Sequence, residues 1–313
     1  MGYAFGIDIG GTTVKMGFFQ KEEGLLEKWE IATQKGNDPT VVLEDIKVAI
    51  YACLERHHVS KEDVEGIGMA APGPVTEGGL LRGTVNIGWG DVYLGKEGER
   101  IFDISPVYIA NDARVAALGE AIYGAGVGEK SMMLLTLGTG IGGGVVFDGT
   151  IHVGSTGVAG EIGHCTVDPY ETAPCSCGKY GCLEQYASAT GMVRVAKRFL
   201  AEEDMPSVLR DKENLTAKDL WDGVTAGDPL SLMIGKHVSR LLGITIANAC
   251  YVVDPDLVVI GGGVSAAGEV LLDMVIAEYK PQVFPHSRGK KFALAKLRNE
   301  AGIYGAAALV FTV

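Results

Sequence analysis

One short stretch of the chain holds a histidine and three cysteines that could bind a metal ion. His164 precedes Cys175, Cys177 and Cys182 in the string GEIGHCTVDPYETAPCSCGKYGCLEQYAS. Zinc in structural sites takes four nitrogen and sulfur ligands tetrahedrally. These four residues are therefore the predicted zinc ligands, and a set of unrelated cysteines near a buried histidine is the alternative. The spacing matches no common zinc finger, so we expect a structural zinc and no nucleic-acid recognition.

Two carboxylates flank the predicted metal loop. Glu161 lies just before His164, and Glu184 follows Cys182. A metal loop between carboxylates is typical of a scaffold that shapes a polar substrate pocket.

Three glycine-rich loops follow predicted strands, and each could bind phosphate through its backbone amides. They are Gly10-Gly11-Thr12, Gly138-Thr139-Gly140 and Gly261-Gly262-Gly263. Asp8 ends the strand before the first loop, where a carboxylate can hold magnesium. The third loop precedes a predicted helix, whose N-terminal dipole favours anions. Together these features favour a nucleotide bound between two domains.

Two other nucleotide motifs are excluded. No Walker A sequence is present, so the chain is not a P-loop protein. Gly138, Gly140 and Gly143 fit the dinucleotide fingerprint, but that fingerprint requires a helix to follow, whereas GVVFDG has the pattern of a strand.

Asp112 is the candidate general base, because it sits where a predicted buried strand meets a helix. The alternative role at this position is a helix N-cap. In phosphoryl transfer an aspartate can accept the proton of the attacking hydroxyl. Side chains on separate loops could bind the hydroxyls of a sugar: Asn86, Asn111, Glu161, His164 and Glu184.

The elements that position these residues follow from hydrophobic periodicity and turn residues. Strands are predicted over 3–9, 13–19, 66–75, 107–110, 132–137, 144–149 and 256–265, and helices over 39–58, 113–124, 268–280 and 301–311, with mostly helical structure over 190–247. The pattern of strand, glycine turn and strand occurs twice. This repetition suggests a duplicated architecture with facing loops, although glycine-rich hairpins are also common singly.

Composition limits the class of protein. The chain has 313 residues, 47% hydrophobic and 21% charged, which suits two globular domains. A net charge of −12 argues against nucleic acid or an anionic membrane as a partner. The six cysteines form no disulfide framework, Cys53 and Cys250 are expected to be buried free thiols, and a reducing cytoplasm fits. We see no signal peptide and no apolar run long enough to span a membrane.

These motifs carry a resemblance that covers essentially the whole chain. The sequence resembles the ROK family of sugar kinases, and within it the glucokinases of the Gram-positive bacterial kind. The similarity rests on GIDIGGTTVKMGFF, APGPV, VNIGW, ANDARVAALGE, LLTLGTGIGGGVV, GEIGH, CSCGKYGCLEQYAS and DLVVIGGGVS, in that order.

The resemblance implies an α/β fold with the two-domain architecture of actin, hexokinase and the Hsp70 ATPase, a duplicated ribonuclease-H-like core and a zinc-binding loop. It implies a small domain over 1–113 plus 300–313 and a large domain over 114–299. The implied reaction moves phosphate from Mg-ATP in the interdomain cleft to the 6-hydroxyl of glucose. A cytoplasmic homodimer or homotetramer is also implied.

The resemblance assigns roles by position. Asp112 becomes the catalytic base, and His164 binds zinc through one ring nitrogen and sugar through the other. The sugar ligands are Gly73, Asn86, Asn111, Asp112, Glu161, His164 and Glu184. The residues implied to bind the phosphates and magnesium are Asp8, Gly10, Gly11, Thr12, Thr139 and Gly140. Those implied to bind adenosine are Gly262 and Gly263.

Two alternatives stay open. The same loops could serve a kinase for another hexose: fructose, mannose, allose or N-acetylmannosamine. A sugar sensor without catalysis is the other, although Asp8 and Asp112 argue against it. Repressors of the family carry a helix-turn-helix ahead of the first strand, where this sequence has two residues.

Overall fold

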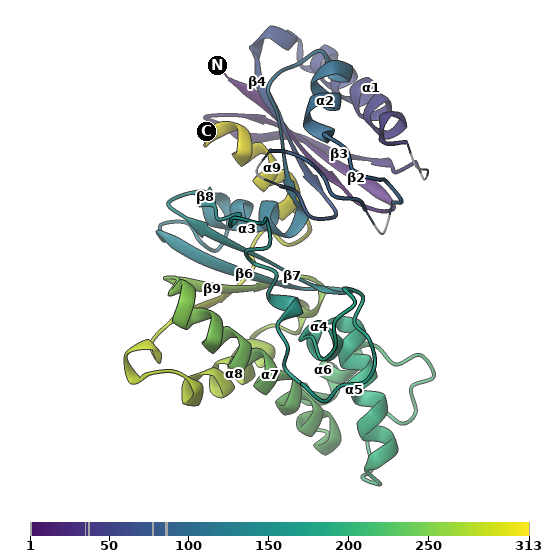
Figure 1. Cartoon of the computed structure of the whole chain (residues 1–313), viewed down its shortest axis with the longest axis vertical. Coiled ribbons are helices and arrows are strands. Elements are labelled where there is room, and N and C mark those ends of the chain that lie inside the picture. The colour runs from purple at the N-terminus through teal and green to yellow at the C-terminus, as the bar shows by residue number, and fades with distance from the viewer. Residues whose placement is uncertain (1, 35, 37, 77, 85–86, 313) are drawn as a thin grey trace. The chain divides into compact units, whose positions relative to one another are not determined.

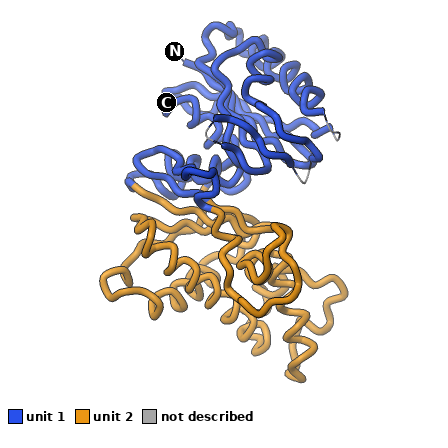
Figure 2. The backbone as a smooth tube through the Cα atoms, in the orientation of Figure 1, with its two compact units in different colours: residues 1–130, 144–160, 297–313 blue, residues 131–143, 161–296 orange. Residues whose placement is uncertain are grey.

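The computed structural model describes residues 2–34, 36, 38–76, 78–84 and 87–312. The chain forms two compact units, which Figure 2 distinguishes by colour. Unit 1 contains residues 1–130, 144–160 and 297–313, and unit 2 contains residues 131–143 and 161–296. Compactness does not test where functional domains begin, so the domain boundaries implied by the resemblance stay a prediction.

The first sheet lies in unit 1 and begins with an antiparallel meander. The hairpin predicted around Gly10–Thr12 is confirmed, because β1 pairs antiparallel with β2 and β2 with β3. β4 and β5 then extend the sheet parallel to β1, in the order β3-β2-β1-β4-β5. The strands are β1 (Tyr3–Ile9), β2 (Thr13–Gln20), β3 (Gly24–Ala32), β4 (Val64–Ala71) and β5 (Val107–Asn111).

Helices cover both faces of this sheet (Figure 1). Phe5 and Ile7 of β1 share a buried apolar cluster with Ile46 and Ile50 of α1. Side chains alternate across a strand, so the intervening Gly6 faces the opposite side, where α9 packs. The helices of this unit are α1 (Pro39–His57), α2 (Leu94–Phe102), α3 (Asp112–Tyr123), α9 (Ala301–Phe311) and the 3₁₀ turns η1 (Lys61–Asp63) and η6 (Arg298–Glu300).

The backbone of α9 packs directly against the backbones of the sheet and of α3. A Cβ placed on Gly6 of β1 would stand 2.0 Å from the carbonyl oxygen of Ile303, and one on Gly68 of β4 would stand 1.8 Å from that of Ala306. A Cβ on Gly305 would stand 1.7 Å from the carbonyl oxygen of Val115 in α3. Only glycine permits such an approach of two backbones.

The second sheet repeats the plan of the first. Its order is β10-β9-β6-β7-β8, with β6, β9 and β10 parallel and β7 antiparallel to β8. β6 occupies the place that β1 holds in the first sheet, which supports the predicted duplication. The division between the two units falls within β7. The strands are β6 (Ser131–Leu137), β7 (Ile141–Phe147), β8 (Thr150–Ile151), β9 (Leu257–Gly261) and β10 (Lys291–Leu294).

Unit 2 is rich in helices, as predicted for 190–247, and the long α7 packs against α8. Its elements are η2 (Ile162–His164), α4 (Glu184–Ala187), α5 (Ala189–Glu202), α6 (Ala217–Thr225), α7 (Pro229–Val253), η3 (Gly263–Ala267), α8 (Glu269–Tyr279), η4 (Lys280–Gln282) and η5 (Pro285–Ser287).

The expectation that no apolar run could span a membrane needs correction. By length and composition alone, α7 could do so, with 25 residues and a mean hydropathy of 1.2 over its most apolar window. That window is 61% buried inside the protein, as in the core helix of a soluble protein, so it is weak evidence for a membrane span.

We predict that Gly305→Ala destabilises the protein. Alanine improves helix propensity by less than about 1 kcal/mol, whereas overpacking at a site with no free space costs about 1–3 kcal/mol. Chemical unfolding should show a lower free energy of unfolding. Gly289→Ala is the control, because no heavy atom lies within 4 Å of the added carbon. Equal stability of wild type and Gly305→Ala would contradict the backbone contact between α3 and α9.

Candidate active site

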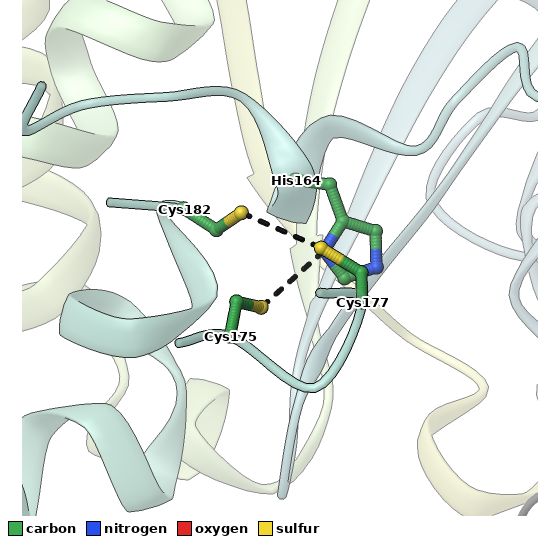
Figure 3. A group of neighbouring side chains, drawn as sticks. All are labelled: His164, Cys175, Cys177 and Cys182. Atoms are coloured by element: carbon green, nitrogen blue, oxygen red, sulfur yellow. Dashed lines mark hydrogen bonds between the residues drawn. The ribbon is translucent and has the colours of Figure 1, made fainter. Parts of the chain in front are cut away.

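The four predicted zinc ligands come together at one point (Figure 3). Their donor atoms all lie within 4.8 Å of one another. His164 Nδ1 is 3.8 Å from Cys175 Sγ, and the sulfurs of Cys177 and Cys182 are 3.7 Å apart. Two thiolates bound tetrahedrally at zinc–sulfur distances of about 2.3 Å would be about 3.8 Å apart. The donor set therefore fits zinc, which would be held by these four residues.

Turns and a bridge bring the ligands together. His164 ends η2, and Cys175 begins a tight turn in which its N–H donates to Lys179 O (2.7 Å). Cys182 forms an isolated antiparallel bridge with Thr166. Because the ligands come from these separate turns, a bound ion would cross-link the turns.

The thiols differ in acidity. Burial raises the pKa of Cys182 to about 12. Burial acts the same way on Cys177, but hydrogen bonds from the Lys179 backbone and from the neighbouring thiols outweigh it and lower the pKa of Cys177. A thiol must lose its proton to bind zinc. Zinc uptake should therefore release protons and weaken as the pH falls.

Asp8 and Asp112 form an electrostatic pair in unit 1. Burial raises the pKa of Asp8 from 3.8 to about 6, the charge of Asp112 adds to the rise, and Lys15 opposes it. The carboxylate of Asp8 also lies against α9, since a Cβ on Gly302 would stand 2.4 Å from Asp8 Oδ2. Two neighbouring carboxylates that repel each other are suited to share a cation.

The first glycine loop follows Asp8 and is held at both ends. The Gly10 N–H donates to Thr13 O (3.0 Å), and the Thr33 hydroxyl donates to Gly10 O (2.7 Å). The Thr33 N–H donates to Thr12 O (2.9 Å). These bonds fix the loop between β1 and β2.

The helix cap beside Asp112 is Asn111. Asn111 Oδ1 accepts from the N–H groups of Ala113 and Arg114, and its Nδ2 donates to Asp112 Oδ1 (2.9 Å) and Gly73 O (3.1 Å). Asp112 is the first residue of α3, and the Ala113 N–H donates to its Oδ1 (2.7 Å). The N-cap alternative for Asp112 is therefore wrong, and Gly73, Asn111 and Asp112 lie together.

A cavity of about 520 Å³ lies in unit 2 beside two of the glycine loops. Thr139 and Gly263, both predicted nucleotide residues, line it together with Gly138. Gly262 has a φ of +79°, and a Cβ there would stand 2.5 Å from Leu137 O, so the loop requires glycine. The helix predicted over 268–280 is confirmed, because α8 covers Glu269–Tyr279. The strand predicted over 256–265 is too long, because β9 ends at Gly261 and a 3₁₀ turn, η3, begins at Gly263.

Sequence reasoning missed one wall of this cavity. α6 contributes Lys218 and Trp221, and its N-cap residue Thr216 also lines the cavity. The signal was present, because Thr216 and Asp219 form a capping box that starts α6. The prediction treated 190–247 as one helical region and did not place this start.

The structure places the predicted site residues in two groups, each described within its own unit. Asn86 lies outside the described residues. Unit 1 holds Asp8, Gly10, Gly11, Thr12, Gly73, Asn111 and Asp112. Unit 2 holds Thr139, Gly140, Glu161, His164, Cys175, Cys177, Cys182, Glu184, Gly262 and Gly263.

Cys53 and Cys250 are buried free thiols, as predicted. The surroundings of Cys53 are more polar than predicted, because its sulfur lies 3.7 Å from Glu27 Oε2, which also lies 2.7 Å from His57 Nε2. Glu27 Oε1 pairs with Arg56 at 2.6 Å. Glu27, His57 and Arg56 form an ordinary, partly exposed cluster of ionisable groups.

Comparisons with known proteins agree with this architecture. The model of the ROK family matches residues 4–313. A glucokinase from Halalkalibacterium halodurans is 43% identical over 310 residues, covering 97% of this chain and 94% of the relative.

Two solved structures share the fold over nearly the full length of both chains. A ROK hexokinase from Thermus thermophilus has a TM-score of 0.84 at 32% identity, covering 99% of this chain and 98% of that one. A ROK family glucokinase from Streptomyces griseus, in complex with glucose and AMPPNP, has a TM-score of 0.79 at 31% identity, with both chains fully covered. The predicted family and fold class are confirmed.

We predict that Asp8→Asn stabilises the protein at neutral pH in magnesium-free buffer. A raised folded-state pKa adds stability below pH 3.8 that is lost as the pH rises through about 6. Removing the charge should recover up to about 3 kcal/mol at pH 7.5 and less than about 1 kcal/mol at pH 4. Chemical unfolding at several pH values measures this, with the exposed Asp45→Asn as control. A gain that is equal at both pH values would contradict the buried charge.

We predict that Cys177→Ser loses its zinc. Serine is a poor zinc ligand, so metal analysis should fall from about one zinc per chain to near zero, with a lower melting temperature. Cys165→Ser is the control, because Cys165 adjoins His164 but is not among the four clustered ligands. Unchanged zinc content in Cys177→Ser would remove this residue from the ligand set.

Proposed function

This chain belongs to the ROK family, and we propose that it transfers phosphate from Mg-ATP to the 6-hydroxyl of glucose. The observation that carries the proposal is the local geometry of Asp112, held at the junction of β5 and α3 by Asn111. The similarity to curated glucokinases supports glucose as the substrate.

Asp112 is the proposed general base. The Asn111 amide and the Ala113 N–H both donate to Asp112 Oδ1, so the carboxyl group is oriented. Its place in the first turn of α3 favours the ionised form, because the N-terminal end of a helix dipole stabilises negative charge. An oriented, ionised carboxylate can accept the proton of the sugar hydroxyl as it attacks the phosphate.

The glycine loops are the proposed phosphate sites. Gly10, Gly11, Thr12, Thr139 and Gly140 offer backbone amides and hydroxyls, and Asp8 is the proposed ligand for magnesium. Magnesium would neutralise charge on the transferred phosphate. Gly262 and Gly263 are proposed to contact adenosine, and the cavity beside Gly263 has walls from α6 and η3 that suit a planar base.

The sugar ligands are proposed on the resemblance. They are Gly73, Asn86, Asn111, Asp112, Glu161, His164 and Glu184. His164 Nδ1 faces the sulfurs, so its Nε2 is the nitrogen proposed to bond a sugar hydroxyl. A zinc ion there would also fix the ring orientation.

The remaining proposals concern context. The small domain, 1–113 plus 300–313, and the large domain, 114–299, are proposed to act together in one reaction. We propose a cytoplasmic homodimer or homotetramer. Another hexose as substrate is the second candidate, supported by a relative from Shewanella named as an N-acetylgalactosamine kinase, which is 30% identical.

We predict that Asp112→Asn loses turnover and keeps sugar affinity. Loss of a general base typically costs about 10²–10⁴-fold in rate, whereas asparagine keeps the size and hydrogen-bonding capacity of the side chain. A coupled ADP-release assay measures kcat, and calorimetry measures the dissociation constant for glucose.

The matched control is Asp63→Asn, an exposed aspartate of η1, which should keep wild-type turnover. Wild type assayed with a panel of hexoses should favour glucose. Normal turnover by Asp112→Asn would remove it as the base, and wild-type preference for another hexose would replace glucose and keep the mechanism.

A further inference from the structure

We propose that Glu184, besides its proposed contact with the sugar, is a positioning residue that connects the glycine loop 138–141 to the cysteine loop, residues 175–182. The shape of the proposed phosphate site would then depend on the cysteine loop. The structural part of this inference stands on contacts within unit 2. Its nucleotide-binding consequence rests on the proposed function.

One oxygen of Glu184 is bonded to the glycine loop. The Ile141 N–H donates to Glu184 Oε2 at 2.9 Å. Bonds from N–H groups to a carboxylate are charge-assisted and about twice as strong as neutral ones. Gly140 makes room for this carboxylate, since a Cβ at that position would stand 2.3 Å from Oε2. A side chain at position 140 would therefore have to displace the Glu184 carboxylate.

The other oxygen of Glu184 is bonded to the cysteine loop. The Ser176 hydroxyl donates to Oε1 at 3.0 Å, and the Cys175 thiol lies 3.8 Å from the same oxygen. Ser176 stands between two of the four clustered ligands, Cys175 and Cys177. A single carboxylate thus joins the two loops.

The segment after Glu184 adds a second connection to the glycine loop. The Ala189 N–H donates to Gly138 O (2.8 Å), and the Thr190 hydroxyl donates to Thr139 O (2.8 Å). The Ser188 hydroxyl donates back to Glu184 O (2.7 Å) and keeps this segment folded. The string LEQYASAT therefore bonds residues 138, 139 and 141.

Through these contacts the cysteine loop would support the glycine loop as well as bind a metal. Thr139 lines the cavity that we assign to the nucleotide. If the cysteine loop unfolds, Ser176 moves and Glu184 loses one of its two attachments. The glycine loop should then open more often, which would weaken nucleotide binding.

Hydrogen exchange tests the connection without any activity measurement. In Ser176→Ala, amide exchange in a peptide covering 138–143 should quicken about tenfold, and metal removal from the wild type should do the same. Ser207→Ala is the matched control, because it removes a serine–carboxylate bond in the same unit, to Asp228 (2.7 Å). Peptides from β1 to β5 report whether metal removal unfolds the whole chain.

A double-mutant cycle tests the contact itself. Gly140→Ala should raise the dissociation constant for Mg-AMPPNP about tenfold, because the methyl group displaces the carboxylate. In the Glu184→Ala background the same change should add less than about twofold, because the obstructing carboxylate is gone. Calorimetry measures all four proteins.

The outcomes are decisive and separable. Unchanged exchange at 138–143 in Ser176→Ala, or additive effects of the two substitutions, would overturn the role of Glu184. Faster exchange in a protein that binds no nucleotide would support the connection and refute the proposed function. Faster exchange with non-additive nucleotide affinities would support both.

Discussion

The close approach of two backbones organises unit 1. α9 crosses β1 and β4 at glycines, and it meets α3 at Gly305, at distances that leave no room for a Cβ. This packing fixes where the sheet, α9 and α3 lie with respect to one another. The carboxylate of Asp8 lies against Gly302 of α9, and Asp112 is the first residue of α3. The position of both acidic groups therefore depends on residues of α9, which lie far from both of them in the sequence.

The loops of unit 2 are held in place by ligands and hydrogen bonds, whereas unit 1 depends on the packing of helices. The cysteine loop is irregular and buries few apolar side chains. A metal ion bound by the four clustered ligands would therefore hold this loop in place, as a hydrophobic core holds other segments. Glu184 and the turn after it extend this order to the glycine loop through hydrogen bonds. Apolar packing thus positions the candidate site residues of unit 1, and hydrogen bonds to the cysteine loop position those of unit 2.

Most elements could be predicted because their signals are local. The β1–β2 hairpin, α1 and α9 follow from periodicity and glycine turns, and α9 begins and ends where predicted. Other features depend on neighbours distant in sequence. Whether Asn111 or Asp112 caps α3 depends on Gly73, whose carbonyl oxygen accepts from Asn111, and sequence alone could not choose. The carboxylate beside Cys53 comes from β3, which periodicity had not assigned.

The packing of α9 also sets the order in which the protein can be completed during synthesis. The sheet of unit 1 is made early, but the face at Gly6 and Gly68 is covered only by residues Ala301–Phe311. While the ribosome makes the intervening residues, that face stays open and exposed to other chains. Long-range contacts of this kind slow folding and favour aggregation. Unit 2, whose segments lie between those of unit 1, is synthesised in full before unit 1 can close.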